Sequence, residues 1–466
     1  MFLERIVSEG LAHFSYLVGS GAKAFVVDPR RDCQVYVDLA KREGMRITHI
    51  FETHRNEDYA IGSQDLVQFT GAKVLHGPGL DWEYGEELAD GQRYRFGGLE
   101  LEAVHTPGHT YESMSYVLRD TSAGSEPVLA FTGDTLFVGD VGRTDLPGPE
   151  HRRKLSELLY DSLHKRLLTL GDGCIIAPAH GAGSVCGGDI ADRATSTIGL
   201  ERTQNPLIRL SKEDFVERKM REILERPPYF SQMEIMNQRR HLPLSGLPVP
   251  QPLVPGEFAE AIGRGAVVVD TRLPHSFAGA HIKGSSSIWI DGLPAYAGWL
   301  LPYDRPLLLV VEDEQQVERV VRMLVRIGYD NVQGYLRGGM VQWYREGLPY
   351  ESTKTMDVHE LKALMSKEEV FVLDPRPHHE WAELHLEGAK HIFVGELEKH
   401  LEEIPKDRPV ASMCSVGFRG SMAAALLQER GYDNVAIVIG GVNAWKAAGY
   451  PVIEQWSFDS EKPAVG

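Results

Sequence analysis

Short apolar runs alternate with longer amphipathic stretches over the first 238 residues. Residues 24–28 and 128–131 have the composition of buried strands, whereas residues 151–168 show helical spacing. Residues 47–51 alternate apolar and polar side chains, as a half-buried strand does. This mixture predicts an α/β domain in which polar turns follow strand ends, where functional sites are usually built.

A proline-rich segment ends this region, and an internal repeat follows it. Residues 241–252 can form neither a helix nor a central strand, so they predict a semi-rigid spacer. Residues 267–272 recur as 371–376, and this offset of about 100 residues matches a whole α/β domain with a parallel sheet. The predicted organisation is a first domain at 1–238, a linker at 239–256, one copy of the repeated domain at 257–352 and a second copy at 353–466.

Composition limits the partners and the compartment. The chain has 466 residues, of which 42% are hydrophobic and 25% charged, as expected for about three globular domains. A formal net charge of −17 argues against a nucleic acid or an anionic membrane as partner. No stretch reaches the roughly 20 apolar residues of a membrane span, and the first residues do not resemble a secretory signal. We therefore expect a cytoplasmic protein.

The cysteines are few and scattered. Cys33, Cys174, Cys186 and Cys414 form no CxxC pair, which favours a reducing compartment over a disulfide scaffold. An important cysteine should then act as a thiol. For the first three we expect ordinary buried side chains, because this is the common fate of a free cysteine.

Cys414 is different because its surroundings suit an anionic sulfur. Residues 409–413 predict a strand that leads into the loop, and residues 422–427 predict a helix beyond it. The amides that open the helix, the helix dipole and Arg419 would all favour a thiolate or a persulfide anion on Cys414. The matching segment of the first copy, residues 308–319, has no cysteine and carries acidic residues. We expect that copy to be a spacer or a docking surface.

Residues 53–59 form a turn of the kind that binds metal through histidines, but two of the expected histidines are missing. His54 begins it and Asp58 lies near its end, but Asn56 and Tyr59 occupy positions where histidines are expected. His109, Asp134 and His180 follow in separate Gly-His, Gly-Asp and Ala-His-Gly motifs. This series resembles the metallo-β-lactamase superfamily, whose hydrolases bind two zinc ions.

More segments narrow the resemblance. Residues 142–145, 178–187 and 196–202 are similar to the persulfide dioxygenase branch of that superfamily. The second repeat copy resembles the rhodanese family through its strand end at Asp374 and Arg376 and its Cys-x-x-Gly-x-Arg loop. The whole chain therefore resembles the bacterial fusions of persulfide dioxygenase and rhodanese that detoxify sulfide. The fold implied is a metallo-β-lactamase αββα sandwich followed by two rhodanese-like α/β domains with parallel sheets.

The resemblance also implies a site and a reaction. His54, His109 and Asp134 would hold one Fe(II) per chain, since two histidines and a carboxylate suit non-haem iron. The iron site would oxidise a low-molecular-weight thiol persulfide with dioxygen to sulfite. Cys414 and Arg419 would then either load persulfide for the iron or combine sulfite with a second persulfide to give thiosulfate.

Roles for the remaining motif residues stay open at this stage. Asp58 and His180 would orient ligands or a water. Arg143 would be a substrate-carboxylate or orienting residue, or else form a structural salt bridge. The thiol could be glutathione, coenzyme A or another, and we expect a homo-oligomer. The alternative enzyme is a zinc thioester hydrolase of the glyoxalase II type that carries a sulfur-carrier domain. A non-enzymatic sulfur carrier or sensor is a third interpretation.

Overall fold

The computed structural model describes residues 1–222 and 225–454, and these divide into two compact units. The first unit comprises Met1–Leu247 and Arg322–Tyr329, and the second comprises Pro248–Val321 and Asp330–Gly466. Of the predicted domains, residues 223–224 of the first and 455–466 of the last lie outside the described residues. Each unit is treated by itself below.

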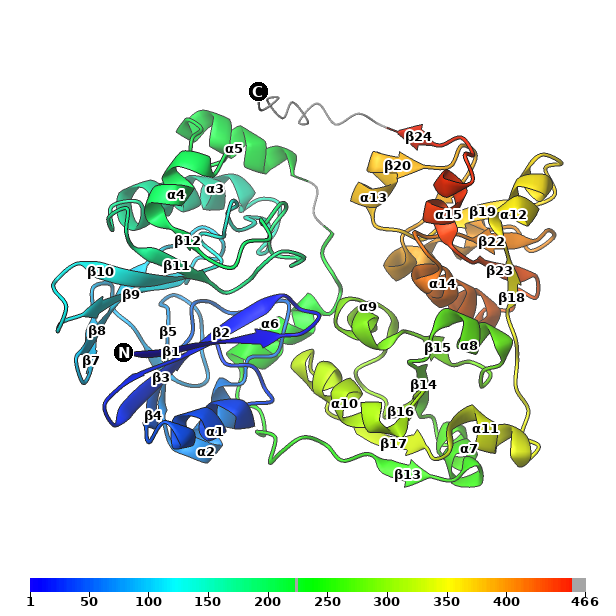
Figure 1. The fold of residues 1–466 in the computed structure, drawn as a ribbon, viewed down its shortest axis with the longest axis horizontal. Helices are drawn as coiled ribbons and strands as arrows, with labels where there is room; N and C mark the ends of the chain where they lie inside the picture. Colours follow the sequence, from blue (N-terminus) through cyan, green and yellow to red (C-terminus); the bar gives the residue numbers. More distant parts are fainter. Residues whose placement is uncertain (223–224, 455–466) are drawn as a thin grey trace. The chain divides into compact units, whose positions relative to one another are not determined.

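The first unit is a sandwich of two sheets with helices on its outer faces (Figure 1). One sheet has the order β1 (Phe2–Ser8), β2 (His13–Ser20), β3 (Lys23–Val27), β4 (Arg46–Phe51), β5 (Lys73–His76), β6 (Glu86–Glu87). The other has the order β12 (Ser196–Thr197), β11 (Ile175–Pro178), β10 (Pro127–Gly133), β9 (Met114–Asp120), β8 (Leu99–His105), β7 (Arg93–Phe96). The helices and turns of this unit are α1 (Gln34–Arg42), α2 (Ser63–Thr70), α3 (Arg152–Ser162), the π-helical η1 (Leu163–Leu167), α4 (Ile198–Gln204), α5 (Lys212–Arg221) and α6 (Phe230–Gln238).

Separate apolar clusters fill the layers of this sandwich. Phe25 and Phe51 of one sheet pack with Tyr116 and Phe131 of the other between the sheets. A second cluster packs α1 on the outer face of the first sheet, and a third packs α3 and α5 on the outer face of the second. Burial on both faces explains why strands such as β10 are apolar along most of their length instead of alternating. The αββα expectation is confirmed.

The second unit contains the repeated domain twice. The first copy has the parallel sheet order β13 (Gln251–Leu253), β17 (Val332–Leu336), β16 (Leu307–Val310), β14 (Val267–Asp270), β15 (Ser286–Ser287). The second copy has the parallel order β18 (Lys354–Met356), β23 (Val435–Val438), β22 (Val410–Ser412), β19 (Phe371–Asp374), β21 (Lys390–His391). Each strand has its counterpart at the same sheet position, so the parallel α/β expectation is confirmed.

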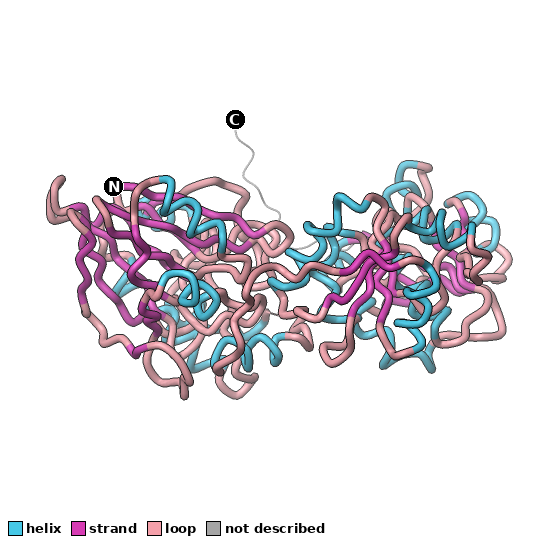
Figure 2. Tube along the Cα trace, turned by 90° about the horizontal axis from the view of Figure 1, so that it is seen from below, coloured by secondary structure: helices cyan, strands magenta, loops and turns pink. Residues whose placement is uncertain are grey.

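Helices flank these sheets, and the strands lie between them in Figure 2. In the first copy they are α7 (Pro255–Gly263), α8 (Pro274–Gly279), η2 (Ile290–Gly292), α9 (Leu293–Leu300), η3 (Glu314–Gln316), α10 (Val317–Arg326) and α11 (Gly339–Arg345). In the second they are α12 (Val358–Met365), α13 (His378–Glu383), η4 (Val394–Glu403), α14 (Phe418–Glu429) and α15 (Gly441–Ala447), while the short β20 (Leu384–His385) pairs with β24 (Ile453–Glu454). Both α11 and α15 follow a glycine with positive φ, 73° at Gly338 and 79° at Gly440.

The linker is shorter than the predicted range of 239–256. Residues 251–253 form β13, and α7 begins at Pro255. Pro252 is tolerated in β13 because this strand lies at the edge of its sheet, where a missing N–H leaves no ladder bond unmade. No helix within the described residues has both the length and the hydropathy to cross a membrane.

Candidate metal centre and sulfur-transfer loop

Loops that follow strand ends bring together three side chains that could hold a metal ion. His54 follows β4, Asp134 follows β10, and His109 lies between β8 and β9. The Nε2 atoms of His54 and His109 lie 3.8 and 3.6 Å from Oδ2 of Asp134, and all three side chains are buried. Distances of this kind leave room for one ion between the three donors.

Hydrogen bonds at Nδ1 fix the orientation of the His54 and His109 rings. Thr53 Oγ1 donates to Asp28 at 2.7 Å and therefore accepts from Nδ1 of His54 at 2.9 Å. Nδ1 of His109 donates to the carbonyl of Arg143 at 2.9 Å. Both Nε2 atoms are thus left as acceptors, and neither has a hydrogen-bond partner among the described residues. Two buried, unpartnered nitrogens that face a carboxylate fit a metal ion.

The protonation states also suit metal ligation. Burial lowers the pKa of His54 to about 3 and also lowers the pKa of His109, so both rings are neutral. Burial alone would raise the pKa of Asp134, but His180 and His54 hold it below its usual range. Neutral imidazoles and a charged carboxylate are the forms that bind metal.

His180 connects this centre to a second group of donors. Its Nδ1 lies 2.8 Å from Oδ1 of Asp134, and its Nε2 lies 2.9 Å from Oδ2 of Asp58. Burial opposes a charge on His180, yet these two carboxylates raise its pKa well above the usual value. Cys186, expected to be an ordinary buried thiol, is buried but has its sulfur within 4.8 Å of the donors of Asp58 and His180.

Asn56 and Tyr59 brace the turn in place of the histidines. Nδ2 of Asn56 donates to the carbonyl of His54 at 3.1 Å. Asn237 on α6 donates to the carbonyls of Asn56 and Tyr59 at 2.6 and 2.7 Å. The ring of Tyr59 packs on His13 with 3.9 Å between centroids. These contacts give the asparagine a structural role that the sequence alone does not reveal.

Glu57 is a neighbour of the centre that sequence reasoning missed. Its Oε2 lies 4.0 Å from Nε2 of His109 and has no hydrogen-bond partner among the described residues, while its Oε1 pairs with Arg55 at 3.3 Å. The side chain is fully buried, and burial raises its pKa well above the usual value. The sequence shows Glu57 only as an acidic residue between His54 and Asp58. Its spacing belongs to no motif that would have predicted its position.

Arg143 is engaged by the protein. Its guanidinium binds both carboxylate oxygens of Asp145, at 2.7 and 2.9 Å, and donates to the carbonyls of Val185 and Glu225 at 3.1 and 3.3 Å. The side chain is buried. These contacts favour the structural salt bridge over binding of a substrate carboxylate, while the orienting role stays a prediction.

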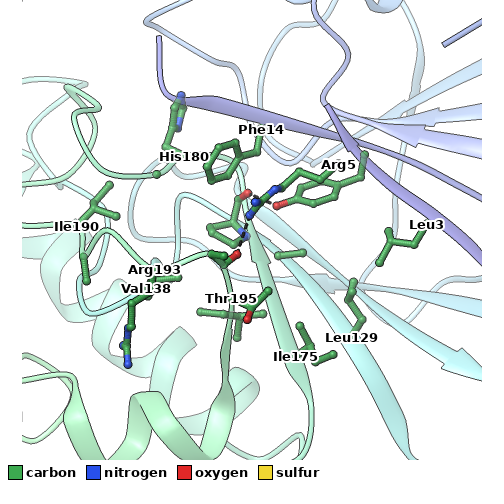
Figure 3. A pocket seen from close by; sticks show the side chains of 17 residues that line it. Leu3, Arg5, Phe14, Leu129, Val138, Ile175, His180, Ile190, Arg193 and Thr195 are labelled. Carbon is green, nitrogen blue, oxygen red and sulfur yellow. Dashed lines mark hydrogen bonds between the residues drawn. The ribbon is translucent and has the colours of Figure 1, made fainter. Parts of the chain in front are cut away.

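A small, mainly apolar cavity includes His180 in its lining but none of the three donors His54, His109 and Asp134 (Figure 3). Phe14, Ile190 and Thr195 line it, and Arg5 crosses it to donate to the carbonyl of Ala194 at 2.7 Å. Its volume is about 120 Å³.

The sulfur of Cys414 faces the start of α14 in the second unit. The amide of Gly417 donates to Sγ at 3.1 Å, and the cysteine is buried. Arg419 donates to both carboxylate oxygens of Glu380 and, at 2.7 Å, to Oγ of Ser415. The structure therefore brings Cys414 and Arg419 into one loop, as the spacing predicts, and adds Glu380 as the partner of the arginine.

Comparisons with known proteins agree with this architecture. The metallo-beta-lactamase superfamily profile matches residues 9–180, and the rhodanese-like domain profile matches residues 254–346 and 357–448. Mitochondrial persulfide dioxygenase ETHE1 of Bos taurus is 33% identical over 216 residues, which cover 44% of this chain and 74% of that protein. Hydroxyacylglutathione hydrolase GloC of Haemophilus influenzae is 26% identical over 208 residues, which cover 40% of this chain and 87% of that protein.

A solved structure extends the likeness beyond the first domain. The crystal structure of a metallo-beta-lactamase from Staphylococcus aureus subsp. aureus COL has a TM-score of 0.65 and 28% identity, and the match covers 72% of this chain and 98% of that one. Fold and site thus define a metallo-β-lactamase domain joined to two rhodanese-like domains, which confirms the resemblance. Within that superfamily the chain belongs to the family of the ETHE1 persulfide dioxygenases.

Proposed function

We propose that this enzyme is a non-haem Fe(II) persulfide dioxygenase whose rhodanese loop transfers sulfane sulfur. One observation supports the dioxygenase: the Nε2 atoms of His54 and His109, which have no hydrogen-bond partner in the described part of the chain, converge with Asp134 in a buried site. Fe(II) held there would supply the activation of dioxygen that sulfur oxidation requires. The likeness to the ETHE1 persulfide dioxygenases supports a persulfide as substrate.

The chain's own residues would hold this site in shape and keep water out. Thr53 and the carbonyl of Arg143 fix the two imidazoles, and His180 holds the carboxylate of Asp134. Burial of every donor limits solvent access. One persulfide, one dioxygen and one water would give one thiol, one sulfite and two protons.

Cys414 would connect that product to sulfur transfer. A persulfide on Cys414 would react with sulfite, so that the sulfur–sulfur bond at the cysteine breaks and a new one forms in thiosulfate. The amide of Gly417 is positioned to stabilise the thiolate that remains. The free state of the four cysteines is consistent with a reducing, cytoplasmic location.

Metal content and oxygen uptake with glutathione persulfide test the dioxygenase. We expect one iron per chain, uptake of dioxygen, and sulfite and thiosulfate as products, all of which His109→Ala should abolish. Zinc without oxygen uptake, together with hydrolysis of a thioester such as S-lactoylglutathione, would favour the hydrolase suggested by the likeness to GloC. If Cys414→Ser still takes up dioxygen, the chain is not merely a sulfur carrier. Sedimentation of the wild-type protein tests the expected homo-oligomer.

A further inference from the structure

A second group of metal-binding residue types lies beside the first centre. Sγ of Cys186, Nε2 of His180 and a carboxylate oxygen of Asp58 all lie within 4.8 Å of one another. The three side chains are buried, and none is more than 1% exposed. Tyr59 occupies the position in the turn at residues 53–59 where a histidine is expected. The cysteine comes from another loop, six residues after His180, and provides a third donor in place of that histidine.

The contacts of His180 require a cation on the side of its Nε2 atom. Its Nδ1 lies 2.8 Å from Oδ1 of Asp134 and donates to it, because an ionised carboxylate only accepts. The other nitrogen of a neutral imidazole is an acceptor, yet Nε2 faces Oδ2 of Asp58 at 2.9 Å. Two acceptors at this distance repel each other unless a proton or a metal ion neutralises them.

The hydrogen bonds that are missing here favour a metal ion over a proton. Neither carboxylate oxygen of Asp58 has a hydrogen-bond partner within the two described ranges of the chain, and the same is true of Nε2 of His180. A proton on Nε2 would engage one carboxylate oxygen and leave the other buried without a partner. A metal ion would instead bond to the nitrogen, to the carboxylate and to the sulfur of Cys186 together.

Backbone hydrogen bonds fix the loop that carries the cysteine. The amide of Arg143 donates to the carbonyl of Cys186 at 3.2 Å, and the amide of Cys186 donates to Oγ of Ser184 at 3.0 Å. The guanidinium of Arg143 donates to the carbonyl of Val185 at 3.1 Å. Because the carbonyl of Arg143 also accepts from His109, one residue positions both a ring of the first centre and the loop of Cys186.

We propose that Asp58, His180 and Cys186 form a second metal site and that this site binds zinc. The site goes beyond the proposed dioxygenase and does not depend on it. Nitrogen, oxygen and sulfur donors together suit Zn²⁺, whereas Mg²⁺ and Ca²⁺ prefer oxygen donors. A thiolate and a carboxylate balance the two charges of the ion, and the thiol releases its proton to solvent when the ion binds. Through its Nδ1 atom, His180 then connects the zinc to Asp134 of the first centre.

Metal binding to the full chain tests this site. We expect the wild-type protein to hold about one zinc ion in addition to the ion of the first centre. When Co²⁺ replaces zinc, a charge-transfer band between thiolate and cobalt should appear in the near ultraviolet. The donors of the first centre are two imidazoles and a carboxylate, so this band reports on the second site.

Cysteine variants identify the sulfur that binds the ion. Cys186→Ser should abolish the charge-transfer band and weaken zinc binding at this site by more than about a hundredfold, while the first centre keeps its ion. Cys174→Ser is the matched control, because Cys174 is a free, buried cysteine of the same unit that packs in an apolar cluster. Both this variant and Cys414→Ser should keep the band. His54→Ala should do the reverse of Cys186→Ser and lose only the ion of the first centre.

Two results would overturn the inference. One is a wild-type protein that binds a single ion at saturating Zn²⁺ or Co²⁺ and shows no thiolate band, which would mean that a proton joins His180 to Asp58. The other is a band that persists in Cys186→Ser. The wild-type and Cys414→Ser measurements decide the question even where Cys186→Ser does not fold. Iron content and oxygen uptake are separate readouts: if both are absent while zinc and the band remain, the proposed dioxygenase fails and the second site stands.

Discussion

The two rhodanese-like copies share a scaffold and differ in their chemistry. Asp270 binds Arg272 through contacts of 2.9 and 2.6 Å, and Asp374 binds Arg376 through the same two distances. Each arginine also donates to a carbonyl eight residues onward, at 2.8 and 2.7 Å. The indoles of Trp343 and Trp445 each donate to a proline carbonyl at 2.9 Å.

Two differences between the copies fall on the groups that would handle sulfur. Where the second copy has Glu380 four positions after Arg376, the first copy has Ser276 four positions after Arg272. The segment after β16 carries Glu312 and no cysteine, whereas the segment after β22 carries Cys414. The comparison indicates that the shared strand-end ion pair supports the fold, whereas the loop and its glutamate are the features through which the second copy would carry out the proposed reaction.

Among the substitutions that test this comparison, Cys414→Ser should have the largest effect on sulfur transfer. Sulfur transfer should fall by about a thousandfold or more, because a hydroxyl cannot carry sulfane sulfur and is a far weaker nucleophile. Thiosulfate formation from glutathione persulfide and sulfite measures it. Cys33→Ala is the control, since Cys33 is equally free but packs in the core of the first unit. Comparable losses in both variants would contradict the assignment.

Asp270→Asn and Asp374→Asn should have the next largest effect. Each should lower the free energy of unfolding, and by the same amount. Each leaves a buried arginine without its carboxylate, which costs about 3 kcal/mol of unfolding free energy. Arg272 is 7% and Arg376 4% exposed, so neither can turn to water. Urea unfolding of the full chain measures both. A difference above about 2 kcal/mol between the two variants would show that the copies do not share a scaffold in energetic terms.

Glu380→Gln should lower sulfur transfer about tenfold while Ser276→Ala leaves it unchanged. Arg419 holds the pKa of Glu380 below its usual value, although burial alone would raise it, so the pair is charged at neutral pH. The amide keeps the shape but removes the charge that fixes the guanidinium. Steady-state kinetics decide between the outcomes, and equal rates for Glu380→Gln and wild type would limit the glutamate to a structural role.

Much of this architecture could be predicted from the sequence because its signals are local. The repeat offset, the turn at His54 and the loop at Cys414 are each contained in a few consecutive residues. Such patterns constrain local backbone geometry, and the strand ends then bring His54, His109 and Asp134 together.

The remaining site features could not be predicted because they depend on packing between distant segments. Asn237 reaches the metal-binding turn from 181 residues beyond Asn56, and no spacing rule connects them. Trp289 lies in a domain that lacks the cysteine, so its packing on Phe418 of the other copy exists only after the two copies pack. Oε2 of Glu57, which has no hydrogen-bond partner over residues 1–222 and 225–454, is likewise a property of the folded turn.

The smallest predicted effect is the contribution of His281, in the cysteine-less copy, to the pH dependence of stability. Burial against Phe277, with 3.9 Å between ring centroids, lowers the pKa of His281 below its usual value of about 6.5. The folded state thus binds fewer protons than the unfolded one, so stability is complete above pH 6.5 and declines as the pH falls below it. Between pH 7 and pH 6 the loss from this one group is at most about 0.7 kcal/mol. Urea unfolding at the two pH values should show a smaller loss for His281→Phe than for wild type, and the exposed His275 provides the matched substitution. An unchanged pH dependence in His281→Phe would mean that the pKa of His281 is the same in the folded and unfolded states.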